Sequence, residues 1–246
     1  MDIISYLKDF KKIHLTDMKS VELMNRIDKK FVFKSKKLPK LLNELSKFYN
    51  ILEVNGNTIQ EYKSLYYDTE DRTFFLAHHN ERVNRYKVRF REYVGSNLFF
   101  LEIKCKNNKG KTLKKRIKVD EINKSLNSKQ LDYIRENIGN DLNLTPKQWI
   151  NFNRITLVDK SFSERLTIDL NLTFSNEVKS DNFNKIVIAE IKKEQHMVSK
   201  FVRIAKKHNI YPTRLSKYCM STIKLEPRIK QNRFKKKLLL INKLNS

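Results

Sequence analysis

The chain has 246 residues, of which 39% are hydrophobic and 11% aromatic. This apolar content is enough for a folded core and excludes a wholly disordered polybasic chain. The formal net charge of +25, from 52 Lys and Arg against 27 Asp and Glu, predicts a polyanionic partner: a nucleic acid, an anionic membrane surface or a phosphate-rich small molecule.

Cys105 and Cys219 are the only cysteines, and the sequence has no CxxC pair. A thiolate metal centre is therefore excluded, and a reducing, cytoplasmic setting is favoured. The first residues lack the basic segment and apolar core of a signal peptide. Because no run of 18 apolar residues occurs, we expect no membrane-spanning helix.

The first half of the chain alternates in strand fashion. Residues 25–34 place Arg26, Asp28 and Lys30 opposite Ile27, Phe31 and Phe33. A leucine stripe predicts a helix over residues 38–49. An aromatic-rich strand over residues 62–68 then ends in a turn at residues 68–71.

Residues 85–91 read Arg-Tyr-Lys-Val-Arg-Phe-Arg. With a period of two, this strand puts four cations on one face and three apolar side chains on the other. Adjacent like charges are unfavourable, so we expect an anion to lie against that face. Turn signals at residues 94–97 and 107–110 predict hairpins to strands 99–106 and 112–119, whose charged faces carry Glu102, Lys104, Lys106, Lys114, Arg116 and Lys118.

The second half continues the pattern. Strands are predicted over residues 149–158, 164–174 and 186–192, with charged faces that carry Arg154, Arg165, Asp169, Glu190 and Lys192. Helices are predicted over residues 130–138 and 198–208, and a last one begins at Ser216, whose hydroxyl can cap it.

Each strand has one apolar and one charged face, and amphipathic helices are available to cover the apolar faces. We predict an α+β fold in which an antiparallel β-barrel of about eight strands, with helices packed outside, encloses a basic tunnel. A dry interior is excluded because unpaired buried cations are costly. The domain is expected to span residues 1–227, followed by a basic tail over residues 228–246.

Two Glu-x-Lys pairs, Glu102 with Lys104 and Glu190 with Lys192, place an acid beside a base on one strand face. A carboxylate among cations stays ionised and can ligate Mg²⁺ or Mn²⁺. A metal ion together with cations is suited to phosphoryl transfer. The alternatives are a solvated basic edge strand, surface ion pairs, and Arg154 or Arg165 acting only as structural partners of Asp169 or Asp159.

These segments, taken in order, resemble a known family. The motifs are Arg26-x-Asp28-x-Lys30-Phe31, Tyr86-Lys87-Val88-Arg89-Phe90-Arg91, Glu102-Ile103-Lys104, Lys114-x-Arg116, Phe152-Asn153-Arg154, Arg165-Leu166-Thr167-Ile168-Asp169, Glu190-Ile191-Lys192 and Ser216-Lys217-Tyr218. Together they are similar to the VTC (vacuolar transporter chaperone) polyphosphate polymerase domain of the triphosphate tunnel metalloenzyme superfamily, over residues 20–225. The first strand lacks the ExExK signature of the sister CYTH group.

The resemblance implies a metal-dependent polyphosphate polymerase, which transfers the γ-phosphoryl group of ATP onto a polyphosphate chain with Mn²⁺ or Mg²⁺. It implies that eight basic residues contact phosphate: Lys30, Arg89, Arg91, Lys104, Lys114, Arg116, Arg154 and Lys217. Further substrate contacts are expected from Arg26, Lys87, Arg165 and Lys192. Glu190 matches the metal-binding glutamate, and Glu102 is a second metal candidate.

The sequence is also compatible with other functions. The same scaffold can serve a tunnel hydrolase of triphosphate or polyphosphate, or a non-catalytic polyphosphate-binding module. No nucleic-acid-binding signature is present, so nucleic acid is not expected as a partner. The tail at residues 228–246 is either a frayed end or a basic amphipathic helix that contacts an anionic membrane or a partner protein, which would make the chain peripheral to a membrane.

Overall fold

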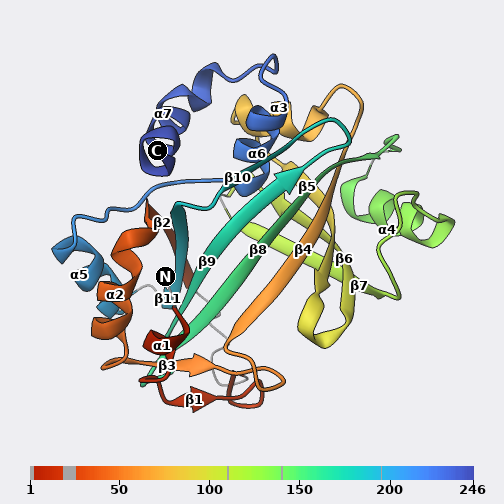
Figure 1. The fold of residues 1–246 in the computed structure, drawn as a ribbon. Coiled ribbons are helices and arrows are strands. Elements are labelled where there is room, and N and C mark those ends of the chain that lie inside the picture. The colour runs from red at the N-terminus through yellow and green to blue at the C-terminus, as the bar shows by residue number, and fades with distance from the viewer. Residues whose placement is uncertain (1–2, 19–25, 110, 140, 195) are drawn as a thin grey trace.

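The structure, a computed structural model, describes residues 3–18, 26–109, 111–139, 141–194 and 196–246. Within them eleven strands form one sheet (Figure 1): β1 Lys12–Ile13, β2 Arg26–Lys34, β3 Tyr49–Leu52, β4 Ile59–Asp68, β5 Arg85–Tyr93, β6 Leu98–Lys106, β7 Thr112–Val119, β8 Thr145–Asp159, β9 Glu164–Ser175, β10 Ser180–Phe183 and β11 Ile186–Glu194. The helices there are α1 Ile4–Leu7, α2 Leu38–Leu45, α3 Thr73–His79, α4 Ser128–Ile138, α5 Lys200–Lys207, α6 Lys217–Leu225 and α7 Lys235–Asn245. The α+β class and the predicted strands are confirmed; Asn25, the first residue predicted for the first strand, lies outside the described residues.

The main path of the sheet has eight strands in the order β2-β11-β9-β8-β4-β5-β6-β7. Every pairing along it is antiparallel. No pairing joins β7 to β2 within the described residues, so the sheet is open and a closed barrel is not confirmed.

The open sheet is nevertheless strongly curled. The backbone N–H of Thr213 donates to the carbonyl of Lys30 on β2 at 2.7 Å, and Lys87 Nζ on β5 donates to Ser216 Oγ at 2.9 Å. In sheet order β2 and β5 are five strand spacings apart, which is roughly 24 Å in a flat sheet. The three residue steps between Thr213 and Ser216 span at most about 10 Å. The sheet therefore bends so that β2 and β5 approach each other across one face, which is called the inner face below.

The outer face of the sheet is apolar on β2, β9 and β11 because of strict alternation. Phe31, Phe33, Leu166, Ile168, Leu170, Val187, Ala189 and Ile191 form one buried cluster with helices α1, α2 and α5. These three helices lie together at the left of Figure 1, beside β2 and β11, and α4 lies at the right, beside β6 and β7. A second cluster on the outer face joins Leu65, Val88, Phe90, Leu101 and Ile103 to Ile134 of α4.

The inner face of the sheet changes from charged to apolar at a β-bulge in β9. Asn151 of β8 pairs with Thr173, whereas Asn153 pairs with Leu170, so β9 carries an extra residue there, and Asn171 has φ of 51°. The bulge reverses the alternation. Asp169 faces inward before it, whereas Leu172 and Phe174 pack into the inner apolar cluster after it. One end of the inner face is therefore charged and the other is apolar.

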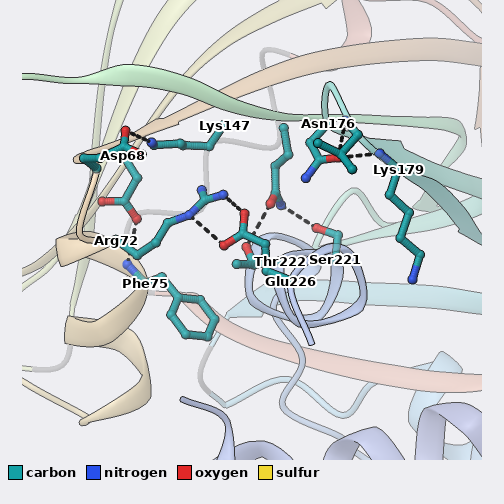
Figure 2. Close-up of polar contacts among 12 residues, drawn as sticks. Asp68, Arg72, Phe75, Lys147, Asn176, Lys179, Ser221, Thr222 and Glu226 are labelled. Carbon is teal, nitrogen blue, oxygen red and sulfur yellow. Dashed lines mark hydrogen bonds and ion pairs between the residues drawn. The ribbon is translucent and has the colours of Figure 1, made fainter. Parts of the chain in front are cut away.

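Helix α6 covers the apolar end of the inner face, which corrects the expectation that all helices lie outside. Ser221 and Thr222 bond the buried Gln148 of β8, and Tyr218 stacks on Tyr66 of β4 with ring centroids 5.0 Å apart. The physical reason is that Leu172, Phe174 and their neighbours turn inward after the bulge and need apolar cover. Figure 2 shows that Arg72, before α3, pairs with Glu226, after α6.

The start of α6 is as predicted, with Ser216 Oγ accepting from the N–H of Cys219. The helix predicted over residues 38–49 is wrong at its end. It stops at Leu45, and Tyr49 begins β3, which pairs with β8. Phe48, counted in the predicted stripe, is 41% exposed. The backbone of Tyr49 has a strand partner in Asp159, so tertiary pairing outweighs the local helical pattern.

Residues 235–245 of the tail form helix α7, whereas the expected contact of the tail with a membrane or a partner protein stays a prediction. Ile241 of α7 is fully buried, and Leu238 and Leu244 pack on the inner apolar cluster. In Figure 1, α7 lies on the same side of the molecule as α6. The division of the chain at residue 227 stays a prediction. In the part of the chain that the structure describes, no helix is both long enough and apolar enough to cross a membrane.

Candidate functional site

The charged end of the inner face, called the polar face below, gathers the bases that the sequence predicted. Cross-strand register places Arg89 opposite Glu102, Glu102 opposite Arg116, Lys104 opposite Lys114, Arg154 opposite Asp169, and Glu190 opposite Lys30. Lys217 reaches the same face from the first turn of α6. Eight bases thus meet three carboxylates: Lys30, Arg89, Arg91, Lys104, Lys114, Arg116, Arg154 and Lys217 against Glu102, Asp169 and Glu190.

Glu102 organises one group of cations. Its side chain is fully buried, one carboxylate oxygen accepts from Arg89 at 2.8 and 2.6 Å, and the other pairs with Lys114. Arg89 also donates to the hydroxyl of Tyr66 at 2.7 Å. Burial opposes ionisation of Glu102, but Arg89, Arg91 and Lys114 outweigh it and hold its pKa well below the usual range.

Asp169 organises the second group. It accepts from Arg154 at 2.6 and 2.9 Å and pairs with Lys217. Burial would raise the pKa of Asp169, but the two cations outweigh it and lower that pKa. One strand further along, Lys30 Nζ donates to Glu190 Oε1 at 2.8 Å. Despite burial, Lys30 and Lys192 lower the pKa of Glu190 to about 2, so this carboxylate is ionised at neutral pH.

Among the buried and half-buried cations of the polar face, Arg91 and Lys104 have no carboxylate partner within the described residues. Arg91 is 6% exposed and donates only to the hydroxyl of Ser64, at 3.2 Å. Burial and repulsion by Arg89 lower its pKa to about 10. The side chain of Lys104 has neither a hydrogen bond nor an ion pair within the described residues, and repulsion by Arg89, together with burial, lowers its pKa well below the ordinary value. Buried cations without a counter-charge are costly unless an anion joins them.

Aromatic rings of the sheet make cation–π contacts with several cations of the polar face. Tyr62 of β4 and Phe152 of β8 are stacked, with centroids 5.2 Å apart and planes 2° apart. Arg91 and Arg154 lie over both rings, at 5.0–5.6 Å from the centroids, and Lys217 Nζ lies 4.6 Å from the centroid of Phe152. Arg116 lies over Phe100 at 4.4 Å. Each contact falls within the range of a cation–π interaction.

The remaining predicted residues lie at the margins. Lys87 is tied to Ser216, Arg116 is exposed on the edge strand β7, and Lys192 is paired in register with both Asp28 and Arg165. Arg26 begins β2, but its side chain lies outside the described residues. The structure thus brings the eight predicted phosphate ligands onto one face, while the roles of all the predicted residues stay predictions.

The polar face offers few free carboxylate oxygens to a metal ion. The described residues contain no group of three or more His, Cys, Asp or Glu that could hold one. Both oxygens of Glu102 and both of Asp169 are engaged by cations. Glu190 keeps one carboxylate oxygen outside its bond to Lys30, on a partly exposed side chain. This donor set fits a hard divalent cation that takes one carboxylate from the protein and further oxygens from phosphate and water.

Tyr62, Ser64, Tyr66 and Phe152 were missed as site residues. Alternation assigns aromatic residues to the buried face of a strand, so Tyr62 and Phe152 were interpreted as core. The available signal was that Tyr62, Ser64 and Tyr66 share one face of a strand, with Ser64 in the middle. A buried serine between two tyrosines indicates a polar neighbour, which is Arg91.

Comparison with known proteins adds to this geometry. A family model, the VTC domain, matches residues 25–226. Among solved structures, a proposed adenylyl cyclase from Hippeastrum, described as having a dominant triphosphatase activity, is 14% identical over 81% of this chain and 96% of its own, with a TM-score of 0.50. A proposed adenylate cyclase from Vibrio parahaemolyticus is 12% identical over 81% of this chain and 99% of its own, with a TM-score of 0.48. Among curated proteins, no sequence matches.

Proposed function

Because this chain belongs to the VTC domain family of the triphosphate tunnel metalloenzyme superfamily, we propose that it is a metal-dependent polyphosphate polymerase. It transfers the γ-phosphoryl group of ATP onto the end of a polyphosphate chain. The observation that carries the proposal is that two cations of the polar face, the buried Arg91 and the half-buried Lys104, have no carboxylate partner in the described residues. A linear phosphate chain supplies the missing negative charge at regular intervals.

The protein's contribution is positioning and charge neutralisation. In phosphoryl transfer the attacking and leaving oxygens lie in line, and little covalent chemistry falls to the protein. Arg89, Arg91 and Lys104 hold one part of the phosphate chain, and Arg154, Lys217 and Lys30 hold the part across the polar face. Glu102 and Asp169 keep these cations in fixed positions through their ion pairs. No protein nucleophile is needed, because the terminal oxygen of the acceptor chain attacks the γ-phosphorus.

Glu190 would hold a bound Mn²⁺ or Mg²⁺ together with substrate phosphates. Such a cation neutralises the charge that develops on the bridging and terminal phosphate oxygens. Glu102 is the second proposed metal ligand, and both of its carboxylate oxygens contact cations, Arg89 and Lys114, which a metal ion would have to displace.

The test is to incubate the purified protein with ATP and Mn²⁺ or Mg²⁺ and to separate acid-insoluble polyphosphate from free phosphate. We expect polyphosphate, with at least a hundredfold loss in Glu190→Gln and in Arg91→Gln, on the scale of removing one group that stabilises charge in a transition state. Exposed Lys115 on β7 provides the control Lys115→Gln, which is expected to keep full activity because its side chain alternates away from the polar face. If the wild type and all three variants produce no polyphosphate, the polymerase assignment is wrong.

A tunnel triphosphatase or polyphosphatase is the second candidate, and the likeness to the Hippeastrum protein favours it. The same cations bind the same chain, and water replaces the acceptor phosphate. In the assay above, this function gives free phosphate from ATP or tripolyphosphate without acid-insoluble product. Loss of that phosphate release in Arg91→Gln would assign the hydrolysis to the polar face.

A non-catalytic polyphosphate-binding module is the third candidate. It predicts tight binding of polyphosphate with no turnover of ATP under any metal. We propose that nucleic acid is not a partner, because the unpaired cations lie in the buried part of a curled sheet, which a duplex cannot enter. Competition between polyphosphate and duplex DNA checks this; a preference for DNA would contradict it.

We further propose a cytoplasmic location, with contact to an anionic membrane or a membrane protein through the tail. Residues 228–246 contain seven Lys and Arg and no Asp or Glu. On α7, Lys235, Lys236, Leu239, Leu240 and Lys243 are exposed, as on helices that lie at a lipid surface. Sedimentation with vesicles that contain or lack anionic lipid, with Lys236→Glu as the variant, decides whether this contact occurs.

A further inference from the structure

Three cations of the polar face share one aromatic support. Arg91, Arg154 and Lys217 come from β5, β8 and α6, yet all three contact the ring of Phe152. The two arginines also contact Tyr62. The negative face of an aromatic ring attracts a cation without removing its charge. This support therefore differs from an ion pair, which would occupy the cation.

The rings are held in place by their surroundings. Phe152 is 3% exposed and lies beside the bulge that interrupts the pairing of β8 with β9. Tyr62 is paired with it across β4 and β8 and also contacts Tyr93, with ring centroids 5.0 Å apart. Because the stacked rings are fixed in this way, they also fix the positions of the three cations that contact them and the distances between those cations.

The local charge balance leaves this group positive. Asp169 is the carboxylate that contacts Arg154 and Lys217, and Arg91 has none within the described residues. Counted over direct contacts, three cations share one carboxylate, an excess of two positive charges, while Glu102 and Glu190 attract them as neighbours. Phosphate groups of a linear chain fit this excess, whereas a closed network of ion pairs would exclude them.

We propose that Tyr62 and Phe152 are positioning residues that hold Arg91, Arg154 and Lys217 together as one subsite for adjacent phosphate groups of the substrate chain. This inference rests on the proposed function of the polar face. The rings act through the three cations and touch no reacting atom. Their role is to set the spacing of the three cations while leaving the positive charges available to bind phosphate groups.

The experiment measures tripolyphosphate binding by calorimetry, without ATP or metal, so that it does not depend on catalysis. Tyr62→Phe keeps the ring, and Tyr62→Leu removes its π face while remaining apolar. Phe152→Leu makes the same change in the partner. Phe174→Leu is the matched control, because Phe174 is equally buried and packs against Phe183 at 4.8 Å, in the apolar end of the inner face. We expect dissociation constants about tenfold higher for Tyr62→Leu and Phe152→Leu, and within about twofold of wild type for Tyr62→Phe and Phe174→Leu.

The inference is overturned if Tyr62→Leu binds as tightly as wild type, or if Tyr62→Phe binds as weakly as Tyr62→Leu. It is also overturned if Phe174→Leu loses as much affinity as Phe152→Leu, since general packing would then explain both. Should Phe152→Leu fail to fold, the two Tyr62 variants still decide. Wild-type protein that does not bind tripolyphosphate at all would instead refute the proposed function, and the subsite with it.

Discussion

At the scale of single residues, the polar face combines cations that are paired with cations that are not. Arg89, Arg154, Lys114 and Lys217 have carboxylate partners, whereas Arg91 and Lys104 have none in the described residues. The ion pairs hold the paired cations in fixed positions. The unpaired ones keep positive charge available, which is the property that a phosphate chain requires.

We expect Lys114 to make tripolyphosphate binding depend on pH. Burial and repulsion by Arg89 and Arg116 outweigh attraction by Glu102 and lower the pKa of Lys114 to about 8. The unliganded protein therefore loses this positive charge as the pH rises through about 8, whereas an exposed lysine keeps it until about pH 10.4. We expect affinity for tripolyphosphate to fall between pH 7 and pH 9, as measured by calorimetry.

The control for this prediction is Lys114→Arg, because arginine stays charged over the whole range. The variant should show a flatter pH profile, with a residual slope from Lys104, whose pKa is also lowered. Ionisation of tripolyphosphate itself is common to both proteins and cancels in the comparison. Identical profiles for the two proteins would show that Lys114 is not the titrating group.

The sequence was sufficient to predict most of the residues on the polar face, because period-two alternation decides which side chains share a face. Lys30, Arg89, Arg91, Lys104 and Glu190 were predicted in this way. The partners of each cation could not be predicted, since they depend on which strands are neighbours. The aromatic support was missed because Phe152 owes its place to packing across β4 and β8.

At the scale of elements, strand periodicity predicted the strands well, but the bulge at Asn171 left no clear sequence signal. The alternation expected for β9 holds for Arg165, Thr167 and Asp169 and reverses at Leu172. The position of α6 on the inner face follows from that reversal. The helix could be predicted from its cap and spacing, whereas its place in the fold could not.

Helix α7 provides a direct stability test of how the tail packs. Ile241 is fully buried against the inner apolar cluster, whereas Leu239 of the same helix is 60% exposed. Truncation of a buried isoleucine to alanine costs about 2–5 kcal/mol, whereas an exposed truncation changes stability by about 0.5 kcal/mol or less. We expect Ile241→Ala to lower the free energy of unfolding by the larger amount and Leu239→Ala by the smaller.

Chemical denaturation of the full chain measures both α7 variants. Equal and small effects would mean that the tail does not pack on the domain. A large effect of Leu239→Ala would mean that the exposed face of α7 is covered in solution, for example by a second copy of the chain. Dilution of the protein would then change the unfolding midpoint.

At the scale of the whole molecule, the curl of the open sheet brings strands that are distant in sheet order toward each other. Residues 213–216 link β2 to β5, and Lys106 on β6 experiences the charges of Lys30 on β2 and Arg214. Bases from distant strands are thereby concentrated over one surface. The net charge of +25 alone would predict attraction to any polyanion, whereas the concentration of cations on one curved face predicts a preference for a thin, linear polyanion.

The most direct measurement compares two double variants that remove the same charge. Arg91→Gln with Lys104→Gln removes two cations from the polar face, and Lys235→Gln with Lys236→Gln removes two exposed cations from α7. Calorimetric titration with tripolyphosphate at 0.15 M salt, where distant surface charges are largely screened, should show at least a tenfold loss of affinity in the first and less than a twofold change in the second. Equal losses in the two would mean that net charge alone attracts phosphate, and would contradict a built site on the polar face.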